Sequence, residues 1–250
     1  MSNQLIIKNK IISNGKLSIC VPIVATTREE IISNIKKYIK EGISFIELRM
    51  DFFEGIRDEK KLKDLLAEIS KYCDDTVLLF TIRSKKEGGN IEIPEEELFE
   101  IFDLASSSGH IDLVDIEALS LNNPTKFVQM LHKNGVKIIG SHHCFDRTYL
   151  DDELDKTFDE IYKIGVDIVK VAMMPENNCD ALRTMMALDR FNKTHDRLSI
   201  AISMGKYGKL SRIFGGQFGS CLTFASLDKA SAPGQVSFKD MVKILDLIED

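Results

Sequence analysis

Residues 166–173 read VDIVKVAM, an apolar run with a single lysine, Lys170, in its middle. Short runs of this kind, rich in β-branched residues, are typical of strands that are covered on both faces, as in a parallel sheet. Further runs are spaced evenly along the chain, at residues 18–24, 44–50, 76–83, 112–117, 136–142, 198–204 and 220–224. The sequence therefore predicts eight strands.

Longer stretches with helical periodicity separate these strands. They cover residues 28–40, 58–72, 94–107, 124–133, 151–164, 177–191 and 237–249, with a weaker stretch at 207–214. Parallel strands need crossovers, and a right-handed crossover lays each helix outside the sheet. The pattern predicts one α/β domain over residues 1–250, folded as a (β/α)8 TIM barrel. The alternative is an open doubly wound sheet, which normally has fewer strands and a glycine-rich first turn.

The residues before the first strand carry a pattern of their own. Residues 4–13 read QLIIKNKIIS and are followed by Asn14 and Gly15. Two short apolar segments around polar residues favour a β-hairpin. We expect a hairpin within residues 1–16 that closes the bottom of the barrel; a loose N-terminal strand is the alternative reading.

Composition excludes several classes of partner. The chain has 250 residues, a net charge of -6 and 44% hydrophobic residues, so its surface as a whole does not suit nucleic acid or an anionic membrane. No apolar stretch reaches the roughly 18 residues of a membrane span, and the cytoplasm is the expected location. The five cysteines form no C-x-x-C pair, so neither a disulfide framework nor a zinc site is predicted.

Chemistry in such a barrel collects at the carboxyl ends of the strands. In residues 44–51, SFIELRMD, strand alternation points Glu47 and Arg49 into the barrel, where they form either a structural ion pair or part of a site. Arg83 ends the strand at 76–83 and could bind substrate oxygens or hold Glu47 and Glu87 in place.

Two further strand ends suggest catalysis. Lys170 shares its face with Ile168 and Ala172, and apolar walls favour the neutral amine, which can attack a carbonyl. His143 ends the fifth strand as a candidate general acid and base, because an imidazole ordinarily has a pKa near neutrality. Its neighbour His142 should point to the opposite face, so we expect no metal bound between the two.

These segments together resemble a known family. ELRMD, TIRSKKEGG, SHHCF, IVKVAMMP, SMGKYGKLSR, FGSCLTF and KASAPGQ occur in the order and spacing of the type I 3-dehydroquinate dehydratases, from about residue 18 to the C-terminus. The resemblance implies a TIM barrel that uses no cofactor and no metal. It also implies conversion of 3-dehydroquinate, a small anionic carboxylate, to 3-dehydroshikimate in the shikimate pathway, by a homodimer.

The resemblance also implies roles for individual residues. Lys170 corresponds to the imine-forming lysine, His143 to the proton shuttle and Glu87 to its carboxylate partner. Arg212 corresponds to the arginine that binds the substrate carboxylate. The remaining substrate-binding positions are Glu47, Arg49, Arg83, Met204, Phe224, Ser231, Ala232 and Gln235. One departure is Cys144, which follows His143 where the family commonly has an acidic or amide residue.

The residue types fit an elimination. An iminium on Lys170 acidifies the adjacent C–H, and His143 can take that proton and return it to the leaving hydroxyl. We expect Glu87 to favour the imidazolium. The alternatives are a class I Schiff-base aldolase, which would need a phosphate site that KASAPGQ supplies poorly, and a non-catalytic metabolite-binding regulator, which would need neither Lys170 nor His143.

Overall fold

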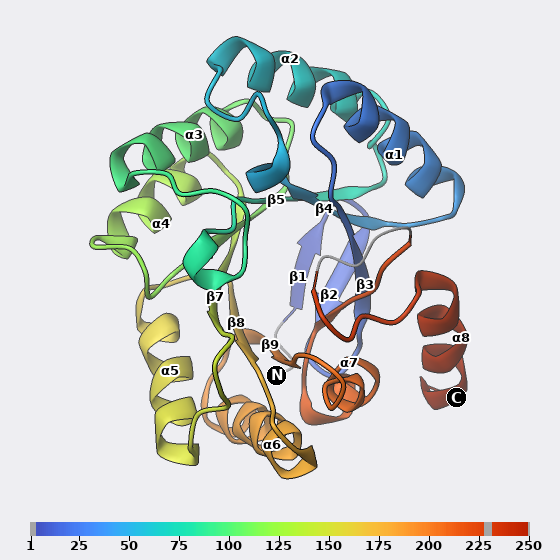
Figure 1. Cartoon of the computed structure of the whole chain (residues 1–250), viewed down its shortest axis with the longest axis vertical. Coiled ribbons are helices and arrows are strands. Elements are labelled where there is room, and N and C mark those ends of the chain that lie inside the picture. Colours follow the sequence, from blue (N-terminus) through green and yellow to red (C-terminus); the bar gives the residue numbers. More distant parts are fainter. Residues whose placement is uncertain (1–3, 228–231, 250) are drawn as a thin grey trace.

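Eight parallel strands surround a common axis in the computed structural model, which describes residues 4–227 and 232–249 (Figure 1). The sheet runs in the order β10-β3-β4-β5-β6-β7-β8-β9, and each hydrogen-bonded pair is parallel. At its two edges, Cys221 N donates to Ser199 O at 2.9 Å, which links β10 to β9. The strands are β3 (Ser18–Ile23), β4 (Phe45–Arg49), β5 (Val77–Thr81), β6 (Leu113–Glu117), β7 (Lys137–Cys144), β8 (Ile168–Met173), β9 (Leu198–Ser203) and β10 (Leu222–Phe224). The predicted TIM barrel is confirmed.

A helix follows each strand and packs on the outside of the barrel (Figure 1). The helices are α1 (Arg28–Lys40), α2 (Glu59–Ser70), α3 (Glu95–Ser107), α4 (Pro124–Lys133), α5 (Asp151–Lys163), α6 (Asn178–Thr194), α7 (Lys209–Phe214) and α8 (Phe238–Glu249). The helix predicted at 177–191 runs on to Thr194 and ends where His195 turns extended. Its last turn is polar and partly exposed, so apolar periodicity gave no signal for it.

Strand alternation divides the core into two layers. Outward residues such as Ile46, Leu48 and Phe80 pack beneath the helices. Inward residues, among them Phe45 and Leu79, fill the barrel. This parity places Glu47 and Arg49 on the inward face with Phe45, as predicted, and leaves the upper part of the barrel to polar side chains.

The N-terminal hairpin closes the lower end of the barrel. Strand β1 (Gln4–Ile7) pairs antiparallel with β2 (Lys10–Ser13), and Ile7 and Ile12 join the inward core layer. Lys8, at the turn, donates to Thr76 O at 2.7 Å and pairs with Asp112 at 2.9 Å, just before β5 and β6. The predicted hairpin is confirmed. In the described part of the chain, no helix is long and apolar enough to span a membrane.

Candidate active site

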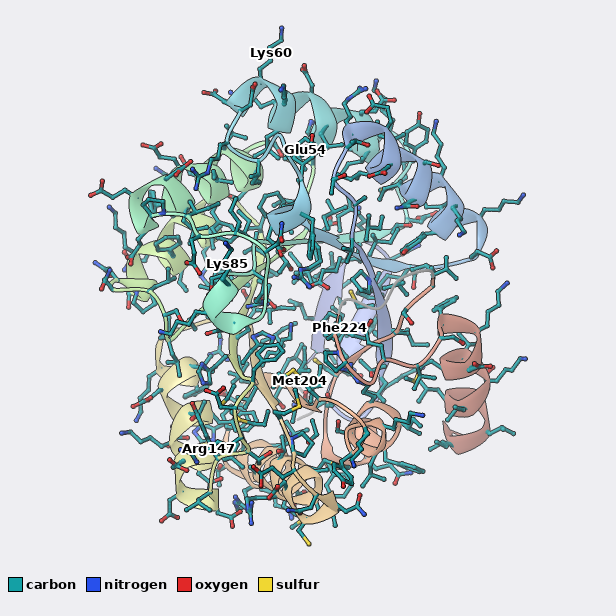
Figure 2. All side chains as sticks on the ribbon, viewed as in Figure 1. Glu54, Lys60, Lys85, Arg147, Met204 and Phe224 are labelled. Carbon is teal, nitrogen blue, oxygen red and sulfur yellow. The ribbon has the colours of Figure 1, made fainter. Side chains whose placement is uncertain are left out.

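A cavity of about 60 Å³ opens at the carboxyl ends of the strands. Eleven of the twelve residues selected from the sequence line it, and the twelfth, Ser231, lies outside the described residues. Figure 2 shows Met204 and Phe224 near the barrel axis, whereas Lys60 and Arg147 lie at the periphery. The lining residues from the prediction are Glu47, Arg49, Arg83, Glu87, His143, Lys170, Met204, Arg212, Phe224, Ala232 and Gln235.

Lys170 lies at the floor of this cavity and is 4% exposed. Its Nζ donates to Asp115 Oδ2 at 2.8 Å and sits 4.5 Å from the centre of the Phe224 ring. The expected wall is therefore only partly apolar. The sequence predicted apolar walls around the amine; strand β6, two strands away, adds a carboxylate.

Asp115 is the functional residue that the sequence reasoning missed. It is fully buried and also accepts from Arg83 Nη2 at 2.7 Å and from Ser141 Oγ at 2.6 Å. Burial by itself would raise the pKa of its carboxyl, but the charges of Arg83 and Lys170 hold that pKa well below its usual range. One buried carboxylate is thus shared by two cations, Arg83 and Lys170.

Arg83 has several acidic neighbours. Besides Asp115, it lies 3.4 Å from Glu117 and 3.6 Å from Glu87 through Nη1. Burial opposes its charge, yet these carboxylates outweigh burial and raise the pKa of the guanidinium. The prediction that Arg83 holds Glu87 in place agrees with this contact; its main partner, however, is Asp115.

His143 and Glu87 form the second reactive pair. His143 Nδ1 lies 2.9 Å from Glu87 Oε2, and a carboxylate can only accept, so Nδ1 carries the proton and Nε2 keeps its lone pair. Burial and the charge of Arg83 lower the pKa of His143 well below its ordinary value, although Glu87 acts in the opposite direction. The imidazole is therefore neutral at pH 7 in the free protein, and the expected preference for the imidazolium is outweighed.

A short tight loop fixes Glu87 above the barrel. The residue belongs to the 3-10 turn η2 (Lys85–Glu87), whose N-cap side chain, Ser84, accepts from Glu87 N at 3.3 Å. Gly89 packs so closely that an added Cβ would stand 1.9 Å from Arg83 O. Only glycine fits there, and the loop geometry is set by backbone contact.

His142 and His143 approach the same carboxylate from two sides. His142 Nδ1 lies 3.5 Å from Glu87 Oε1, while His143 uses Oε2. The two rings leave β7 on different faces, but Glu87 lies beyond the strand end, where both can reach it. No cluster of three or more His, Cys, Asp or Glu side chains suited to a metal ion occurs in residues 4–227 and 232–249.

Glu47 and Arg49 do not pair with each other among the described contacts. Arg49 instead makes a bidentate ion pair with Asp51, with both N–O distances at 2.8 Å. Glu47 accepts from Thr81 Oγ1 at 2.9 Å. Both side chains are buried and face the cavity, so each presents a fixed polar group to a ligand.

Arg212 is a buried cation of a different kind. Its guanidinium is 1% exposed and donates to the carbonyl oxygens of Phe224 and Pro233, at 3.3 and 3.2 Å. Within the described residues its Nε has no hydrogen-bond partner and no carboxylate pairs with it. Burial lowers its pKa to about 10, which leaves it charged at pH 7. An anionic ligand would supply the missing counter-charge.

Residues 232–235 border the cavity beside Arg212. Pro233 O also accepts from Gly205 N at 3.2 Å, and an added Cβ at Gly234 would stand 2.2 Å from Gly205 O. This close contact joins the segment after β10 to the loop after β9.

A larger cavity, of about 220 Å³, lies outside the barrel between α3 and the loop after β5. Two of its carboxylates are engaged within the chain: Glu117 accepts from Ser84 N at 2.7 Å, and Glu95 accepts from Asn122 N at 2.8 Å. The larger cavity is lined by neither a histidine nor Lys170, so the smaller cavity is the candidate active site.

A TIM barrel with a buried amine, a neutral imidazole and an unpaired guanidinium at its mouth belongs to the class of barrel enzymes that act on small anions. The type I 3-dehydroquinase family matches residues 19–250. The chain belongs to this family and is a hydro-lyase.

Individual relatives extend the match over nearly the whole chain. The 3-dehydroquinate dehydratase of Clostridioides difficile (strain 630) is 36% identical over 250 residues, covering 99% of this chain and 98% of its own. That of Listeria monocytogenes serotype 4b (strain F2365) is 34% identical over 247 residues, covering 98% of each.

Solved structures agree with these relatives. The type I enzyme from Clostridium difficile, solved with covalently modified comenic acid, has a TM-score of 0.95 at 36% identity, covering 99% of this chain and 98% of that one. The enzyme from Geobacillus kaustophilus HTA426 also has a TM-score of 0.95, at 29% identity, covering 98% and 96%.

Proposed function

We propose that this protein removes water from 3-dehydroquinate to give 3-dehydroshikimate through an imine on Lys170. The carrying observation is that Lys170, His143 and Arg212 line one cavity, with an amine, a neutral base and an unpaired cation available to one small ligand. The names of the relatives supply the substrate, and the relative that carries a covalently modified ligand supports a covalent route.

The first step is imine formation. The Lys170 ammonium passes its proton to the neutral His143, and the freed amine attacks the C3 carbonyl of the substrate. The carbinolamine hydroxyl then takes that proton back from His143 and leaves as water, which gives the iminium and leaves His143 neutral. Asp115, 2.8 Å from Nζ, is the counter-ion of the ammonium before the reaction and of the iminium after it. A buried carboxylate in this place favours the protonated imine, which is the form that withdraws electrons.

The second step is proton abstraction by His143. Nε2 of the neutral ring takes the proton from the carbon next to the iminium, and the C–H electron pair forms an enamine. The resulting imidazolium is stabilised by Glu87 at 2.9 Å. The enamine then re-forms the iminium and expels the β-hydroxyl, which leaves as water with the proton from His143. Hydrolysis of the iminium releases the enone and restores Lys170.

The remaining polar residues hold the substrate in place. Arg212 binds the carboxylate, because its buried charge has no acidic partner in the described chain. Glu47, Arg49 and Arg83 contact the hydroxyl groups and fix the pose. Met204, Phe224, Ala232 and Gln235 form the apolar wall and the covering segment. The family resemblance also implies a substrate contact from Ser231, which lies outside the described residues.

An enone assay with chemical trapping tests the proposal. The protein is incubated with 3-dehydroquinate while enone absorbance is followed, then treated with borohydride, and the adduct is mapped by mass spectrometry. We expect turnover and an adduct on Lys170. Lys170→Ala should bind the ligand and lose nearly all turnover, whereas Lys206→Ala, at an exposed lysine of the same mouth, should retain it. No turnover in the wild type, or an adduct elsewhere, would refute the proposal.

The setting of the reaction completes the proposal. We infer that the protein works in the shikimate pathway, in the cytoplasm, as one catalytic domain and as a homodimer, and that the chemistry is carried by side chains alone. Membership of the family supports these inferences. Sedimentation equilibrium at micromolar concentration tests the dimer, and a monomeric mass would contradict it.

A further inference from the structure

A second imidazole lies against the carboxylate that serves His143. His142 Nδ1 is buried, has no hydrogen-bond partner among the described residues, and has Glu87 Oε1 as an acceptor at 3.5 Å. Its Nε2 lies 3.0 Å from the hydroxyl of Tyr149. The ring is thus placed between a carboxylate and a phenol.

We propose that His142 is a positioning residue for the reaction: it donates from Nδ1 to Glu87 Oε1, and so keeps Glu87 ionised and aimed at His143. The inference rests on the proposed function, since it concerns how His143 is prepared as a base. It assigns a role to a residue that strand alternation alone would place outside the site.

The tautomer of His142 follows from its two neighbours. A carboxylate can only accept, so Nδ1 carries the proton in the favoured arrangement. Nε2 then bears the lone pair and accepts from the Tyr149 hydroxyl, which can donate. Tyr149 therefore selects the tautomer that presents a donor to Glu87. Arg147 lies over the Tyr149 ring at 4.7 Å and is itself paired with Glu153. These two contacts fix the position of the phenol.

Each oxygen of Glu87 has a distinct set of donors. Oε2 receives His143 Nδ1 at 2.9 Å and His143 N at 3.1 Å. Oε1 receives Ser120 Oγ at 3.1 Å and faces His142. When His143 becomes charged, it attracts Oε2 of Glu87 more strongly and can rotate the carboxylate. A hydrogen-bond donor at Oε1 resists that rotation. The 3.5 Å separation is long in the free protein, and catalytic hydrogen bonds of this kind commonly shorten when substrate is bound.

The electrostatics of Glu87 point the same way. Burial would raise the pKa of its carboxyl, but the two histidine rings that face it, His142 and His143, together with the charge of Arg83, hold that pKa far below its usual range. Without the His142 donor, Glu87 should take up a proton at higher pH. A neutral Glu87 no longer stabilises the imidazolium of His143, so the acid limb of the reaction should move.

Other titratable groups share this environment. The groups that face His142 or its partners are Arg83 and Glu87 after β5, Glu117 on β6, His143 and Cys144 on β7, and Tyr149, Arg147 and Glu153 beyond it. Among them, Glu87 is the group on which His142 acts directly, so substitutions of His142 are matched with a variant that keeps the donor.

Two variants separate the donor from the volume of the ring. His142→Leu removes the donor, whereas in His142→Asn the amide NH2 occupies nearly the place of Nδ1–H. With 3-dehydroquinate, we expect His142→Leu to lower kcat roughly 10-fold with little change in KM, at the low end for a hydrogen bond to a charged group. Its acid limb should shift to higher pH by about one unit. His142→Asn should restore both properties, and Tyr149→Phe should show a smaller shift of the same sign.

Nitrogen-15 NMR of the histidine side chains supplies a readout that needs no substrate. In the wild type His143 should be protonated at Nδ1, and in His142→Leu this tautomer should lose occupancy in the pH range where Glu87 is newly protonated. His132→Leu, at an exposed ring paired with Asp167, is the control for loss of a histidine. Unchanged pH limbs and tautomer in His142→Leu, or failure of His142→Asn to restore them, would overturn the proposal. Absence of turnover in the wild type would instead refute the proposed function.

Discussion

Replacement of Asp115 by Asn tests whether one buried carboxylate holds the base of the cavity together. The carboxylate lies 2.8 Å from Lys170 and 2.7 Å from Arg83, and it is wholly buried. An asparagine keeps the shape but removes the charge, and it turns one oxygen into a donor that faces a cation. Arg83 retains Glu117 and Glu87 as acidic partners, whereas Lys170 loses the one carboxylate with which it is paired among the described residues.

The size of the effect follows from the burial. Removing one partner of a buried ion pair costs about 3–5 kcal/mol of unfolding free energy. An ordinary lysine can escape the penalty by releasing its proton, which costs about 4–5 kcal/mol at pH 7, so the loss has a ceiling of this order. We expect a loss of about 3–4 kcal/mol at pH 7. This loss of stability should shrink by up to about 1.4 kcal/mol per pH unit toward pH 9.5. The reason is that, in the variant, the unfolded chain keeps the lysine proton that the folded chain has released.

Urea unfolding at pH 7 and 9.5 measures this loss, and a double-mutant cycle with Lys170→Met assigns it to the pair. In the Lys170→Met background, Asp115→Asn should cost at least about 2 kcal/mol less than in the wild type, since the stranded cation is gone. A loss below about 1 kcal/mol, or equal losses in the two backgrounds, would refute the reasoning.

Three other predictions concern separate parts of the site. The folded-state pKa of His143 lies below its unfolded value of about 6.5, so the free energy of unfolding falls as the pH drops below that value. His143→Asn should abolish about 2–3 kcal/mol of this loss between pH 6.5 and 4.5, as measured by urea unfolding at each pH. An unchanged slope of stability against pH would contradict it. Arg212→Met should raise KM roughly 10- to 150-fold while thermal stability changes little, since the free protein loses no ion pair. Gly89→Ala should displace the loop that carries Glu87 and abolish turnover, whereas Gly42→Ala, in open space at φ +80°, should retain activity.

The barrel and most of the cavity could be predicted from the sequence because they depend on local order. The periodicity of two fixes which side chains of a strand face inward, and that rule placed Glu47, Arg49 and Lys170 correctly. The family segments then selected residues outside the strands, such as Arg212 on α7, whose positions depend on contacts that no local pattern encodes.

Asp115 escaped prediction for a physical reason. It lies in the strand segment DLVDIE, where its inward direction could have been inferred, but its partners lie just after β5 and on β8. Contacts across the inside of a barrel join residues far apart in sequence, and a single chain does not show which inward positions share a height. The sequence analysis also missed that His142 and His143 both face Glu87. Glu87 lies on a loop that extends beyond the end of β7, where strand alternation no longer separates the two rings.

The lone guanidinium of Arg212 has a consequence for which ligands the cavity accepts. Arg49, Arg83 and Lys170 each lie beside a carboxylate, so among the described residues Arg212 is the cavity cation without an acidic partner. A ligand with a single negative group can pair with it. A second negative group, as on a phosphate ester, would meet the carboxylates of Glu47 and Glu87, which line the same cavity. The cavity therefore discriminates by ionic valence, and we expect it to reject sugar phosphates of suitable shape because they carry too much charge.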